Sequence, residues 1–151
     1  MEIAGDVNAR ITALEVFGSV TSLVATEFAT VLQRVGVLVA FPACLVILRS
    51  AEYEGGRPMT CQRARTVLVN CLMVGEVSAD IDADSDTVWG YADTVARAFL
   101  PAAGANQPVV LNDVIYHPDA IEAVRTGNDN LAALNLRLQA IDAMQDGRSD
   151  I

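Results

Sequence analysis

Residues 43–50 read ACLVILRS and residues 65–74 read RTVLVNCLMV, and these two stretches decide the fold class. In the first stretch both alternating sets of side chains are apolar, which is typical of a strand covered on both faces. The second stretch also alternates, with one face formed by Val67, Val69, Cys71 and Met73. Its other face is formed by Thr66, Leu68, Asn70 and Leu72. We therefore expect a central strand followed by a second strand antiparallel to it.

Helical periodicity appears on both sides of these strands. Near the N-terminus Asp6 is available as a helix cap, and one helical face is formed by Ile3, Val7, Ile11 and Leu14. A second helical face, which ends before Pro101 and has Arg97 near its end, is formed by Val88, Ala92, Val95 and Phe99. Residues 19–35 fit either a strand or a helix, and their pattern slightly favours a helix.

The C-terminal third adds further elements. Residues 109–116 read VVLNDVIY and predict a strand, and residues 118–126 predict a short helix closed by Gly127. Residues 131–140 predict a half-buried strand, because leucines alternate with polar residues. The expected fold is α+β, a mainly antiparallel sheet of about four strands flanked by two or three helices. We expect one domain over residues 1–141 and a polar tail over 142–151 that is loose unless a partner orders it.

Composition excludes several classes of function. The chain has 151 residues, 19 acidic against 10 basic side chains, and a formal charge of −9, which opposes binding to nucleic acid. All ten basic residues are arginines, so chemistry that needs a lysine is excluded. The apolar stretch 35–48 is shorter than the roughly 20 residues of a membrane-spanning helix. The start, MEIAGDVNAR, has no basic cluster, so no secretory signal is predicted.

The residues that could support catalysis or metal binding are few. One histidine, His117, and three cysteines without a CxxC pair predict no metal site and no cofactor. The alternating acids at 80, 82, 84 and 86 do not fit the EF-hand spacing, and an acidic loop that caps the next helix is favoured over a cation site. A nucleophile built from Cys61 or Cys71 with His117 stays open as a minor alternative, without a family signature in its spacing. We favour the interpretation that these thiols have no catalytic role, and we predict no enzymatic activity.

Charged residues gather around the long connection that we expect at residues 51–62. Three arginines follow two glutamates there and precede the acid-rich stretch 76–86. Loops of opposite sign suit a ring in which each subunit joins its neighbour head to tail. An ordinary mixed surface explains the charges equally well.

The segment FPACLVILRSAEYEGG, residues 41–56, resembles the corresponding stretch of lambda-type phage tail terminator proteins. In both, Phe-Pro-Ala introduces a strand, and Ala-Glu-Tyr followed by glycine leaves it. The order of the following elements is also similar: a second strand, an acidic linker, a helix containing a tryptophan (Trp89), and a closing amphipathic strand. The resemblance covers residues 40–141, with similarity at the level of letters only in 41–56.

This resemblance implies a structural protein of the virion. Such a subunit forms a homohexameric ring on the tail tube, stops tube polymerisation and joins the head-side connector, or stopper, protein. DNA passes through the lumen without specific binding, no membrane is involved, and assembly takes place in the host cytoplasm. The expected interface with other subunits or the tube comprises Glu52, Tyr53, Glu54, Arg57, Arg63, Arg65, Asp80 and Asp82. Alternatives are a head-completion or connector ring protein of the same neck, a binding module and, less favoured, the thiol enzyme.

Overall fold

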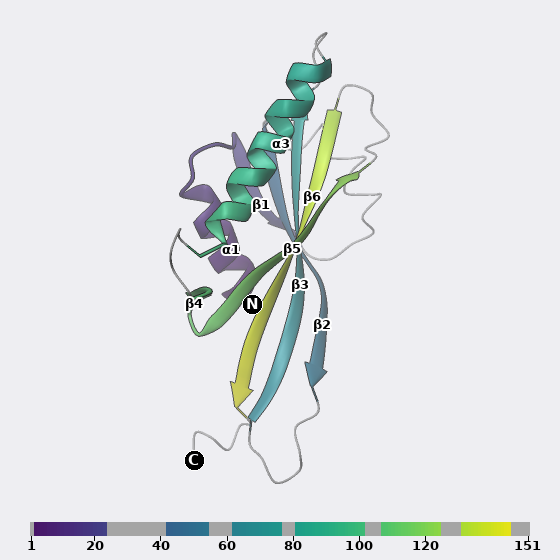
Figure 1. The fold of residues 1–151 in the computed structure, drawn as a ribbon. Helices are drawn as coiled ribbons and strands as arrows, with labels where there is room; N and C mark the ends of the chain where they lie inside the picture. Colours follow the sequence, from purple (N-terminus) through teal and green to yellow (C-terminus); the bar gives the residue numbers. More distant parts are fainter. Residues whose placement is uncertain are drawn as a thin grey trace.

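The computed structural model describes residues 2–23, 42–54, 62–76, 81–101, 107–124 and 131–145. Six strands form one sheet in the order β1-β2-β3-β6-β5-β4, in which β1 and β2 are parallel and all other pairs antiparallel. Both helices cover the same face (Figure 1). The elements are α1 (Glu2–Thr12), β1 (Ser19–Leu23), β2 (Ala43–Glu54), β3 (Gln62–Glu76), α3 (Ile81–Ala98), β4 (Val109–Leu111), β5 (Val114–Val124) and β6 (Leu131–Gln145).

The predicted fold class is wrong in its strand number and pairing. The described residues lie mostly in strands, and they form a curled, mixed sheet of six strands with two helices. One reason is that β5 occupies most of the predicted helix 118–126, since a register shift between Pro118 and Ala120 accommodates the proline. Another is that residues 19–23, where the pattern slightly favours a helix, form β1. Residues 24–35 lie outside the described residues.

The two strands that decide the fold lie side by side inside the sheet, but β2 is next to the edge strand β1, and the central pair is β3 and β6. Strands β2 and β3 pair antiparallel, and Cys44 and Val46 on one face and Leu45 and Ile47 on the other are all buried. The helix-facing side belongs to the main core, and the opposite side to a second apolar cluster with Leu72 and others. The prediction of a strand covered on both faces is therefore confirmed.

The two predicted helical faces are also confirmed. Ile3, Val7 and Ile11 of α1 are buried, and so are Val88, Ala92, Val95 and Phe99 of α3 and the turn that follows it. Gly75 of β3 permits the close approach of α3, because a Cβ atom there would lie 3.0 Å from Cγ2 of Val88. Asp6 does not cap α1, since it lies within the helix.

The third predicted strand is in fact a hairpin. Strands β4 and β5 are joined by Asn112 and Asp113, which have φ angles of 49° and 66°. Positive φ at both positions of a two-residue turn is typical of a type I′ turn, which suits the twist of a hairpin. Asparagine and aspartate tolerate this conformation better than most residues.

Three strands extend beyond their predicted limits. Strand β6 continues to Gln145, so its last four residues fall within the segment predicted as a loose tail, and only residues after 145 lie outside the description. Its pairing with β3 explains the extension, because Gln62↔Gln145 is the last matched pair. The predicted connection 51–62 is likewise shorter, since β2 includes Glu54 and β3 begins at Gln62.

Candidate functional site

Most of the predicted interface residues that the structure describes lie at one end of the long strands. Glu52 and Tyr53 are near the end of β2, and Arg65 is near the start of β3. Tyr53 and Arg65 are direct partners across the two strands. Tyr53 is 61% exposed, which is high for a large aromatic side chain. Figure 1 shows that β2, β3 and β6 run past both helices to reach this end.

Arg65 is engaged within its own chain. Its guanidinium Nη2 donates a hydrogen bond of 2.7 Å to Asp142 Oδ2, and the two side chains are only 15% and 24% exposed. The register explains the contact, because Arg65 faces Tyr53 on one side and Asp142 on the other. Arg65, one of the three predicted interface arginines, therefore forms an ion pair within its own chain. Sequence reasoning missed Asp142 because residues 142–151 read as a polar tail.

The other predicted interface residues are only partly located. Glu54 and Arg63 belong to β2 and β3 at the same end, paired with Ala64 and Met144, and nothing is described of their side chains. Arg57 and Asp80 lie outside the described residues. Asp82 belongs to the first turn of α3, and its side chain is likewise not described.

Among the residues that the structure describes, Arg63 and Arg65 do not share one site with Asp82. Helix α3 begins beyond the far end of β3, and the strand from Arg65 to that end spans about 36 Å at the usual rise of about 3.3 Å per residue. Figure 1 shows the start of α3 and the paired ends of β2 and β3 at opposite ends of the molecule. A contact between Arg65 and Asp82 therefore requires two different molecules.

A row of apolar side chains crosses the sheet face that points away from the helices. The register aligns Val110 with Ile115, and Ile115 with Ile141. Val114 and Tyr116, on either side of Ile115, point into the helix-side core, so Ile115 points the other way. Val110 is 51% exposed and Ile115 is 38% exposed. A water-facing strand normally carries polar residues at such positions, so this row, which we call the open-face row, is a candidate contact surface.

The sequence contained only an ambiguous signal for the open-face row. Strand β5 alternates as expected, but alternation does not say which set of side chains the helices cover. The signal that was available is the apolar content of both sets in residues 109–116.

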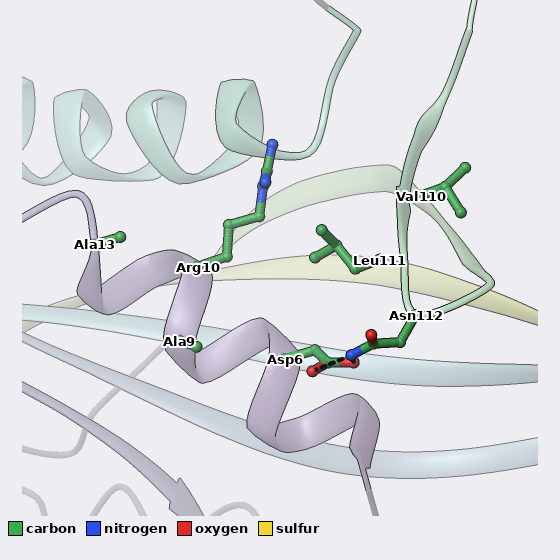
Figure 2. Close-up of a pocket in the computed structure, with 7 residues that line it drawn as sticks. All are labelled: Asp6, Ala9, Arg10, Ala13, Val110, Leu111 and Asn112. Atoms are coloured by element: carbon green, nitrogen blue, oxygen red, sulfur yellow. Dashed lines mark hydrogen bonds between the residues drawn. The ribbon is translucent and has the colours of Figure 1, made fainter.

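A groove of about 460 Å³ lies between α1 and the β4–β5 hairpin. Figure 2 shows the side chain of Leu111 pointing toward the helix, whereas that of Val110 points away from it. The small side chains of Ala9 and Ala13 line the helix side of the groove. Its polar lining consists of Asp6, Arg10 and Asn112.

Both charged residues of the groove, Asp6 and Arg10, already form hydrogen bonds within the chain. Both carboxylate oxygens of Asp6 lie 2.9 Å from the Nδ2 donor of Asn112. Arg10 donates from Nε to the carbonyl oxygen of Ala98 at 2.6 Å, and its guanidinium carbon lies 5.8 Å from the centre of the Phe99 ring. The groove therefore lies where α1 contacts both the β4–β5 hairpin and the end of α3. Its charged side chains, Asp6 and Arg10, take part in these contacts within the fold.

The structure does not bring Cys71 and His117 together as a thiol system. Cys71 belongs to the helix-side core and is fully buried, and burial raises the pKa of its thiol to about 12. His117 follows Tyr116 in β5 and is exposed on the opposite face. Burial, and secondarily the nearby Cys71, also raise the pKa of the Cys44 thiol. Cys61 lies outside the described residues.

Within the described ranges, no group of three or more metal-ligating side chains comes together. The same part of the chain contains no helix long and apolar enough to cross a membrane. No protein-family model matches the chain, and no curated protein sequence matches it. The resemblance to tail terminators therefore rests on residues 41–56, which contain the whole of β2, and on the order of elements along the chain.

Proposed function

We propose that this chain is a structural protein of a phage virion, a tail terminator that assembles as a homohexameric ring on the end of the tail tube. In that position the ring stops polymerisation of the tube and presents a surface to the head-side connector. The observation that carries the proposal is the resemblance of residues 41–56, which contain the whole of the interior strand β2.

The shape of the subunit supports an assembly role. Strand β2 and its partners extend beyond the helices to an end that exposes Tyr53. The opposite sheet face exposes the open-face row. Exposed aromatic and aliphatic side chains of this kind are enriched at the centre of protein interfaces. In this proposal the strand end contacts the tail tube, and the open-face row contacts a neighbouring subunit.

The electrostatics support a ring through which DNA passes. A charge of −9 on each subunit repels phosphate, so the lumen would let DNA slide without specific binding. The partners in this proposal are other copies of the chain, the tail tube protein and the connector, or stopper, protein. The proposed location is the neck of the virion, after assembly in the host cytoplasm, and the proposal assigns the chain no catalytic role and no cofactor.

Two measurements test the proposal. Light scattering over a concentration series should find a species near six times the chain mass of 16.0 kDa. Electron microscopy of tubes polymerised from the tail tube protein of the same virus should then find the ring at one end, with shorter tubes as its concentration rises. A chain that stays monomeric and leaves tube length unchanged would contradict the proposal. A ring that attaches to DNA-filled heads without tails would instead favour the connector alternative.

A further inference from the structure

We draw no further inference here: the strongest candidate, the groove between α1 and the β4–β5 hairpin, is lined by one acidic and one basic side chain that both already form hydrogen bonds within the chain, and nothing in the described part of the structure shows what occupies it.

Discussion

Asp6 of α1 accepts hydrogen bonds from Asn112, and 106 positions of sequence separate the two residues. Near the other edge of the sheet, Asn8 of the same helix donates to the carbonyl oxygen of Val20 at 3.4 Å and to Ser22 Oγ at 3.0 Å. Helix α1 thus holds both β1 and the β4–β5 turn, the two margins of the curled sheet. One short helix therefore links the two edges of the sheet through side-chain hydrogen bonds.

We predict that Asn112→Ala destabilises the fold more than Asn112→Gly. Both substitutions remove the bond to Asp6, which we expect to cost about 0.5–1.5 kcal/mol. Alanine also has to adopt the positive φ of 49°, at an additional cost of about 1 kcal/mol, which glycine avoids. Urea unfolding measures both, and in an Asp6→Ala background the cost of Asn112→Gly should fall to near zero. Equal stabilities for the two variants would contradict this account of the turn.

The partly buried ion pair between Arg65 and Asp142 should stabilise the folded chain. Arg65→Ala and Asp142→Ala each leave a polar partner with little access to water, so we expect a loss of about 1–3 kcal/mol for either one. The double variant should lose less than the sum of the two, as measured in a double-mutant cycle. Arg97→Ala, which breaks the exposed pair with Asp93, should change stability by less than about 0.5 kcal/mol. If the double variant lost as much unfolding free energy as the two single variants together, the contact between Arg65 and Asp142 would not stabilise the fold.

Tyr116 should make stability fall at high pH. Burial, and then the charges of Asp6 and Asp142, raise its pKa from 10.0 to about 12. Below pH 10 the folded and unfolded chains both keep the phenol proton, so no effect is expected. Between pH 10 and 12 the unfolded chain releases it first, and the folded state loses about 2–3 kcal/mol relative to a Tyr116→Phe variant.

The Tyr116→Phe variant also has a clear expectation at neutral pH. Within the described part of the chain the hydroxyl is buried without a hydrogen-bond partner, so its removal should be neutral or slightly stabilising. Tyrosinate absorbance should lose the component that titrates near pH 12. A variant that unfolds with the same pH dependence as the wild type would contradict the raised pKa.

Cys44 and Cys71 should resist alkylation in the folded protein. Both are buried, and the raised pKa of each thiol leaves almost no thiolate at pH 8. In a Cys61→Ser variant, iodoacetamide should label these thiols at least about 100-fold more slowly than in urea. Fast labelling of Cys71 in the folded chain would favour the thiol-enzyme alternative.

The sequence predicted the elements whose periodicity is unambiguous and whose contacts are local. Examples are strands β2 and β3 and the apolar faces of α1 and α3, because the spacing of their apolar residues indicates which faces are buried. Pro118 misled the interpretation of β5, because a proline after a strand usually ends it, whereas a register shift here accommodates it.

The candidate site was less predictable because its contacts are long-range. Arg65 looks available for a partner in the sequence, but its partner Asp142 lies 77 positions away, within the stretch that reads as a polar tail. The exposure of Ile115 follows from which face the helices cover, and that choice is made only by tertiary packing.

The central claim, that this chain is the subunit of a closed ring, is tested most directly by its mass in solution. We would measure sedimentation equilibrium of the purified chain over a wide concentration range. The account predicts a discrete species near six times the chain mass of 16.0 kDa that keeps its mass on dilution. A mass of 16.0 kDa at every concentration would contradict it.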